Sequence, residues 1–263
     1  MQPDYKNWMP KELILYTLIG TICCLILFFV FGISNLLAIG TLKTILKTVF
    51  LVLTIALTLV VLWMWLMYRA FSYNGKRQMS KQIIDGISRH IHIPDGGKCL
   101  DVGCGSGALA IAVAKRNPRA EIIGIDRWGK EYASYSLALC QKNAQAENVT
   151  NIQFAKGNAL HLNFADETFD AVTSNYVYHN IPSRNRQDIL LETLRVLKKG
   201  GTFAIHDIFS HIRYGDMKAF VQQLKNMGYD KVELINTSNG MFMTHMEALW
   251  MGLAGSAMII GKK

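Results

Sequence analysis

The 263-residue sequence has little charge, little proline and no regular spacing of cysteine. Only 18% of its residues are charged and 51% are hydrophobic, which excludes a disordered or mainly solvating chain. Five prolines and 21 glycines exclude collagen-like and Pro/Gly-rich low-complexity proteins. The five cysteines form no spaced pairs, so we expect reduced thiols in a cytosolic setting rather than a disulfide framework or a zinc site. One or two domains with a substantial core remain.

Two segments, residues 13–33 and 49–68, contain no charged side chain. As helices, runs of 21 and 20 residues extend over about 30 Å, the thickness of the hydrocarbon core of a bilayer. We therefore predict a membrane anchor of two transmembrane helices over residues 1–69 and a soluble domain over residues 70–263. Two buried core helices and a cleaved signal peptide are the alternatives.

Basic side chains flank the outer ends of these two runs. Lys6 and Lys11 precede the first run and Arg69 follows the second, while residues 34–48 are expected to form the short connection. By the positive-inside rule, both termini and the soluble domain should lie in the cytoplasm. The hairpin contains no charge that would suggest transport, so the bilayer is expected to serve as its anchoring partner.

Short apolar runs alternate with helical patterns after residue 77. The expected strands are residues 98–102, 121–126, 152–156, 169–174, 202–207, 231–236 and 254–261. The expected helices are residues 78–91, 108–116, 130–146, 187–197 and 216–227. This alternation predicts an α/β fold with a parallel, doubly wound sheet.

A glycine-rich turn follows the first of these strands. It reads Asp101-Val102-Gly103-Cys104-Gly105-Ser106-Gly107 and leads into a helix, an arrangement that brings backbone amides close to a bound ligand. Asp126 ends the next strand, 25 residues after Asp101, where a carboxylate can accept hydrogen bonds from both ribose hydroxyls of an adenosine. Together they indicate a nucleotide-type cofactor; the alternatives are an empty glycine loop and a helix-capping aspartate.

These motifs resemble those of the class I S-adenosylmethionine-dependent methyltransferases over about residues 78–261. Gly157-Asn158-Ala159 resembles a third family segment, with Asn158 where the family usually has an aspartate that contacts adenine. The resemblance implies a Rossmann-like seven-stranded sheet whose last strand is antiparallel. It also implies S-adenosylmethionine as cofactor, S-adenosylhomocysteine as product and no metal. The cofactor-binding residues it implies are Asp101, Gly103, Cys104, Gly105, Gly107, Asp126, Arg127, Asn158, Ala159 and Asn175.

The methyl acceptor should bind near the loop after the fourth strand, residues 174–182. His179 in this loop is a candidate general base, because histidine commonly exchanges protons near neutral pH; a packing role is the alternative. Asp207, after the fifth strand, either orients the acceptor or a histidine, or caps the next segment. The loop lacks the Asn/Asp-Pro-Pro-aromatic pattern of amino methyltransferases and the domain lacks a basic stripe with aromatics, so no nucleic acid is expected as partner.

We therefore predict a membrane-anchored methyltransferase for a small, lipophilic acceptor such as a quinol, phenol, lipid or thiol. The motifs resemble the ubiquinone/menaquinone methyltransferase-like branch, whose usual soluble form has no such anchor. A methyltransferase of a membrane protein partner and a non-catalytic S-adenosylmethionine-binding membrane protein are the alternatives. The acceptor and the oligomeric state are left open.

Overall fold

The chain is described by a computed structural model over residues 2–34, 40–129 and 134–263. Contacts divide it into two compact units. Asn7–Ser80 forms the smaller unit. Lys81–Lys263, together with the start of the chain up to Lys6, forms the larger one, called the catalytic unit below.

The smaller unit is a pair of apolar helices. α1 (Lys11–Leu27) continues as the π-helical segment η1 (Phe28–Ile33), and α2 spans Thr41–Phe71. By length and composition, both are able to cross a membrane. Threonine hydroxyls within them donate to carbonyls four residues earlier, so these hydroxyls have partners inside their own helix. The described residues that do so are Thr17, Thr21, Thr44, Thr54 and Thr58.

α2 is longer than the uncharged run that predicted it. It begins at Thr41 rather than at residue 49, so the expected connection through residue 48 is wrong for residues 41–48. These residues contain neither proline nor glycine, so nothing in them ends a helix. Lys43 lies in this first part of α2 and its Nζ donates to the carbonyl oxygen of Ser34 at 2.7 Å.

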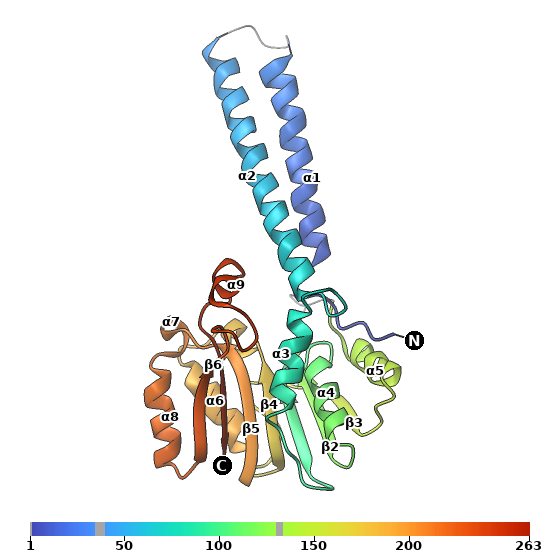
Figure 1. Ribbon diagram of the computed structural model, residues 1–263, viewed down its shortest axis with the longest axis vertical. Helices are drawn as coiled ribbons and strands as arrows, with labels where there is room; N and C mark the ends of the chain where they lie inside the picture. Colours follow the sequence, from blue (N-terminus) through green and yellow to red (C-terminus); the bar gives the residue numbers. More distant parts are fainter. Residues whose placement is uncertain (1, 35–39, 130–133) are drawn as a thin grey trace. The chain divides into compact units, whose positions relative to one another are not determined.

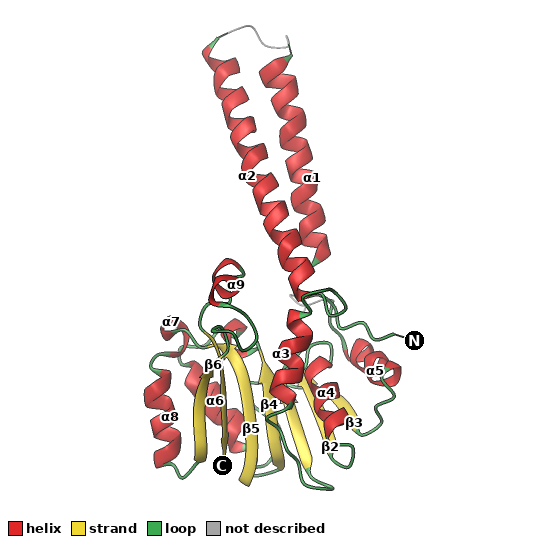
Figure 2. Cartoon of the chain, in the orientation of Figure 1, coloured by secondary structure: helices red, strands yellow, loops and turns green. Residues whose placement is uncertain are grey.

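The catalytic unit is built on one seven-stranded sheet (Figure 2). Its strands are β1 (Lys98–Val102), β2 (Glu121–Asp126), β3 (Ile152–Lys156), β4 (Phe169–Asn175), β5 (Leu197–Ile208), β6 (Asp230–Asn236) and β7 (Ser256–Lys262). The strand order is β3-β2-β1-β4-β5-β7-β6. β7 runs antiparallel to both β5 and β6, and the remaining pairs are parallel. The predicted Rossmann-like fold with an antiparallel last strand is confirmed. We call the edge at which the parallel strands end the carboxyl edge and the opposite one the amino edge.

Helices cover both faces of this sheet. They are α3 (Met79–Ser88), α4 (Ala108–Arg116), α5 (Leu137–Ala146), α6 (Arg186–Arg195) and α8 (Met217–Asn226). In Figure 1, α3 and α4 lie in front of the strands and α6 lies behind them. Three short helices that the sequence did not predict are η3 (Tyr178–Asn180), α7 (His211–Tyr214) and α9 (His245–Trp250).

Two helix boundaries differ from their predicted places. The helix expected from residue 130 begins at Leu137, because Ser136 is extended and its side chain accepts from the amide of Leu139. Residues 130–133 of that expectation lie outside the described residues. The helix expected over residues 187–197 is α6, and Leu197 instead begins β5.

One part of the core of the catalytic unit lies between the sheet and α6 and α8. Tyr178, Phe169 and Phe203 are among its largest fully buried side chains. The Tyr178 hydroxyl lies 2.8 Å from the hydroxyl of Thr193, which is also fully enclosed. Because a buried hydroxyl without a partner destabilises a fold, this pair ties α6 to the loop after β4.

Tyr178→Phe should lower the free energy of unfolding by about 1–2 kcal/mol, because it removes one partner and leaves the other buried. Tyr178→Phe combined with Thr193→Val should cost less than the sum of the two single changes. Denaturant unfolding of the full chain in detergent measures this cycle. Strict additivity would show that the two hydroxyls do not interact.

Candidate functional site

The glycine turn between β1 and α4 has the backbone conformation that glycine favours. Gly103, Gly105 and Gly107 have φ of +73°, +55° and +83°. A Cβ on Gly103 would lie 2.3 Å from Val177 Cγ2, so that position also admits no side chain. A Cβ on Gly105 would meet no atom closer than 4.0 Å, which leaves open space above the turn where a ligand can approach the backbone.

Asp126 lies beside this turn at the end of β2. One carboxylate oxygen accepts from the Gly105 amide at 2.9 Å, and the other accepts from the Trp128 amide at 2.7 Å. The Trp128 indole in turn donates to the Gly105 carbonyl at 3.0 Å. Asp126, Trp128 and the turn are thus held together as one structure. Trp128 was not identified from the sequence.

Asp101 is buried below the turn. Its Oδ1 accepts from the Thr173 hydroxyl at 2.7 Å, while Oδ2 has no hydrogen-bond partner within the described residues. Burial raises the pKa of Asp101 to about 7, against the lowering effect of the Thr173 hydroxyl. A buried carboxyl with an unused oxygen fits a ligand that brings a cationic donor, and the amino group of S-adenosylmethionine is one.

The remaining predicted cofactor residues also lie at the carboxyl edge. Asn158 and Ala159 follow β3, and the Asn158 side chain accepts from the amide of Leu160 at 3.1 Å. Arg127 follows Asp126 and is exposed. Cys104 is buried in the turn. Their contacts with a cofactor stay predictions.

Asn175, at the end of β4, is held by a buried histidine. His206 lies with Nδ1 2.8 Å from Asn175 Oδ1 and Nε2 2.9 Å from the Thr237 hydroxyl. Burial lowers the pKa of His206 to about 3, so the ring is neutral in the working range. Since an amide oxygen only accepts, Nδ1 carries the hydrogen and Nε2 accepts from Thr237. These contacts fix the orientation of the Asn175 side-chain amide, whose oxygen accepts from His206. Thr237, which holds the other nitrogen of His206, was not identified from the sequence.

The two candidate catalytic residues are in direct contact. His179 Nδ1 lies 2.5 Å from Asp207 Oδ1, and Asp207 Oδ2 accepts from the amides of Tyr178 and His179. Asp207 is fully buried and the His179 side chain is 13% exposed. Since a carboxylate accepts, the hydrogen resides on Nδ1 and the lone pair on Nε2 is available to take a proton. Of the roles considered for Asp207, orienting a histidine fits this geometry.

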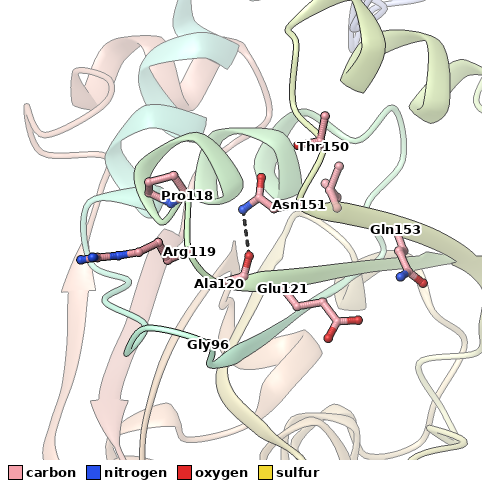
Figure 3. Close-up of a pocket in the computed structure, with 9 residues that line it drawn as sticks. Gly96, Pro118, Arg119, Ala120, Glu121, Thr150, Asn151 and Gln153 are labelled. Carbon is pink, nitrogen blue, oxygen red and sulfur yellow. Dashed lines mark hydrogen bonds between the residues drawn. The ribbon is translucent and has the colours of Figure 1, made fainter.

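A hollow of about 270 Å³ lies at the amino edge of the sheet (Figure 3). Arg119, Glu121 and Gln153 are among the residues around it, and Asn151 closes one side by donating to the Ala120 carbonyl at 2.8 Å. Among the described residues, those lining it include no predicted cofactor or catalytic residue. The assembled polar groups of the candidate site lie at the other edge.

Comparison with known families agrees with this placement. The family model of the methyltransferase domain matches residues 93–248, more than half of the chain. The chain belongs to this methyltransferase family. The glycine turn, Asp126 and the His179–Asp207 pair all fall within the matched residues. The predictions of a class I methyltransferase and of S-adenosylmethionine as its cofactor are confirmed.

Similar methyltransferases include quinone-modifying enzymes. The chain is 30% identical over 149 residues to the demethylmenaquinone methyltransferase of Bacillus subtilis, an alignment of 56% of this chain and 61% of that protein. It is 36% identical over 133 residues to the demethylmenaquinone methyltransferase of Lactiplantibacillus plantarum, covering 47% of this chain and 53% of that protein. The chain thus spans about half the length of the curated relatives it matches. The resemblance to the ubiquinone/menaquinone branch is confirmed.

Solved structures share the fold at low identity. The [4+2]-cyclase SpnF superposes with a TM-score of 0.55 at 18% identity, over 73% of this chain and 85% of that chain. A geranyl diphosphate methyltransferase in complex with GPP and sinefungin gives 0.55 at 13% identity, over 74% and 81%. One of the two is a cyclase, so the chemistry must be argued from the site rather than from the fold.

Asp126→Asn should weaken S-adenosylmethionine binding by about 1–3 kcal/mol, because charge-assisted hydrogen bonds to the ribose are lost. Calorimetry of the full chain in detergent measures this affinity. Asp95→Asn, which changes an exposed carboxylate at the amino edge, is the matched control and should bind as the parent does. Equal affinities in the two variants would remove the ribose-binding role.

Asp101→Asn should stabilise the cofactor-free protein at pH 8 but not at pH 4. The pKa of Asp101 is raised in the folded state, so the folded state retains a proton that the unfolded state releases. The parent therefore loses stability as the pH rises from about 4 to about 7, by at most about 4 kcal/mol. Thermal midpoints of the two proteins across this range test the prediction. A pH-independent difference between them would contradict it.

Proposed function

We propose that the chain transfers the methyl group of S-adenosylmethionine to a small lipophilic acceptor of the quinol class, with α1 and α2 anchoring it in a membrane. The observation that carries the proposal is the His179–Asp207 pair at the carboxyl ends of β4 and β5. This pair lies at the same edge as the glycine turn and Asp126. The names of the relatives from Bacillus subtilis and Lactiplantibacillus plantarum favour a quinol among the acceptors considered.

The proposed cofactor site combines the glycine turn with the residues that end β2 and follow β3. The open backbone at Gly105 leaves room for close approach, Asp126 would accept from the ribose hydroxyls, and Asn158 would accept from the adenine amino group. When bound, S-adenosylmethionine supplies a methyl group activated on a sulfonium centre. The protein's main task is therefore to align the acceptor with it and to exclude water.

His179 provides the base that a neutral acceptor needs. Its Nε2 takes the proton of an acceptor hydroxyl, while Asp207 holds Nδ1 and stabilises the imidazolium. The deprotonated ring of the acceptor is electron-rich, and one of its carbons would form the new bond to the methyl group as the carbon–sulfur bond breaks. The acceptor ring would regain aromaticity by releasing the proton from the methylated carbon, and its oxygen would take a proton back from His179. The electron pair of the broken bond would leave with S-adenosylhomocysteine. The net products are methylated acceptor, S-adenosylhomocysteine and one proton.

The anchor keeps the enzyme where lipophilic acceptors are concentrated. α1 with η1 covers 23 residues and α2 covers 31, each enough to cross the hydrocarbon core. Their apolar side chains are largely exposed, which favours a lipid environment over the core of a soluble protein. The basic flanks Lys6, Lys11 and Arg69 favour cytoplasmic termini and a cytoplasmic catalytic unit.

His179→Ala and Asp207→Asn should each lower turnover by about 100-fold or more while cofactor affinity stays near that of the parent, because general-base catalysis is lost. The assay uses the full chain in its native membrane with methyl-labelled S-adenosylmethionine, followed by extraction into organic solvent. His90→Ala removes an exposed histidine outside the site and is the control.

Label should appear in the organic fraction of the parent and be lost in the His179 variant. Label on polypeptide would instead assign a membrane protein as acceptor. Cofactor binding without any labelled product in native membrane would identify a non-catalytic binding protein. Unchanged turnover in His179→Ala would exclude His179 as the general base.

A further inference from the structure

The large apolar side chains exposed on the catalytic unit are concentrated at the carboxyl edge. In the described part of this unit eight are exposed, and all but Met227 belong to segments at that edge. The seven are Leu137, Leu160, Ile212, Met241, Met246, Leu249 and Trp250. The amino edge instead presents ion pairs, such as Arg119 with Asp95. Such an asymmetry is typical of a surface that meets an apolar partner.

α7 and α9 present the most exposed members of this set. Ile212 on α7 is 97% exposed, and Met246 and Leu249 on α9 are 68% and 52% exposed. α9 is a well-anchored helix, with a capping box at its start and Ala248 buried on its inner side. The segments adjoin, because the Phe209 amide before α7 donates to the Gly255 carbonyl after α9. Figure 2 shows both helices beyond the same end of the strands.

Aromatic rings lie between the segment before α9 and the candidate base His179. Phe242, just before α9, lies with its ring 5.6 Å from His206. The His206 ring is 4.6 Å from Tyr176, whose ring is 6.0 Å from that of His179. A set of rings therefore runs from Phe242, three residues before the start of α9, to His179.

Three arginines lie on α7 or close to it in the same region. Arg186 donates to the Arg213 carbonyl at 3.3 Å, Arg213 donates to the His179 carbonyl at 3.2 Å, and Arg184 is exposed two residues from Arg186. No carboxylate lies within ion-pair distance of these arginines in the residues that the structure describes. Because a guanidinium carries five donors, each retains capacity for anionic groups such as lipid phosphates.

Both covalent attachments to the anchor leave the catalytic unit at this edge. Asp4 exchanges hydrogen bonds with the side chain of Asn143, which also donates to the Ser106 carbonyl in the glycine turn. Residues 7–10 alone separate this N-terminal segment from α1, a span of at most about 18 Å. The other attachment is α3, which runs antiparallel to β1 and so begins toward the carboxyl edge.

We propose that the carboxyl edge of the catalytic unit seats on the membrane surface through α7 and α9. Ile212, Met246 and Leu249 enter the acyl region, Trp250 lies at the interface, and the arginines contact anionic headgroups. A lipophilic acceptor then reaches His179 from the bilayer without crossing water. This seating rests on the proposed function, which supplies the anchor and the acceptor.

The test uses the full chain reconstituted in vesicles, with Cys23→Ala and Cys24→Ala to remove the thiols of α1. A polarity-sensitive fluorophore is attached at Leu249→Cys, at Met246→Cys as a second site, and at Met227→Cys as the control on the amino edge. Met227 is a suitable match because it is 55% exposed, compared with 52% for Leu249. Cofactor binding by calorimetry selects the variants that are folded.

Nitroxide quenchers on the lipid acyl chains should quench the fluorophore at Leu249 and Met246 severalfold more than at Met227. The contrast should increase when phosphatidylglycerol is mixed into phosphatidylcholine, and Arg184→Gln should reduce that increase. Resistance to extraction with alkaline carbonate shows that the protein is inserted in the membrane. In such protein, equal quenching at both edges would overturn the seating and leave the proposed anchor in place. A severalfold contrast without labelled lipophilic product would support the seating and overturn the proposed acceptor.

Discussion

The buried carboxylate of Asp207 is the constraint on which the candidate site depends. It accepts hydrogen bonds from the amides of Tyr178, His179 and Ile208 and contacts His179 Nδ1, and these contacts offset the cost of removing a charge from water. Because β4 and β5 are adjacent and parallel, one side chain at the end of β5 shapes the turn that follows β4. The position of His179 is thus set by a side chain of the sheet as well as by the loop that carries it.

Two histidines at this edge differ in chemistry because their surroundings differ. His206 is fully enclosed between Asn175 and Thr237, so it stays neutral and acts as a support. His179 is partly exposed and has one ring nitrogen bound to Asp207, which leaves its other nitrogen for the role of base proposed above. From the sequence alone both were histidines next to strand ends, and burial is what separates their roles.

Sequence patterns predicted the sheet because its central strands are short segments rich in apolar residues and are largely buried. They also placed Asp126 beside the glycine turn, since the carboxyl ends of neighbouring parallel strands meet. They missed Trp128, whose indole reaches the turn from a backbone with φ of +44°, and Thr237, which meets His206 across the sheet. Such contacts depend on tertiary packing and leave no local pattern. α9 was missed although its Thr244–Glu247 capping box is visible in the sequence, because six residues show no clear periodicity.

The position of β7 has a consequence for how the protein is made. β7 is translated after β6 but lies between β5 and β6, pairing with both. While β6 emerges from the ribosome, the strand that will join it to the sheet does not yet exist, and the free edge of β5 is unpaired. By then the two apolar helices have long been synthesised. Completion of the sheet is therefore a late event that takes place on a chain already able to associate with lipid, where a chaperone has the most reason to act.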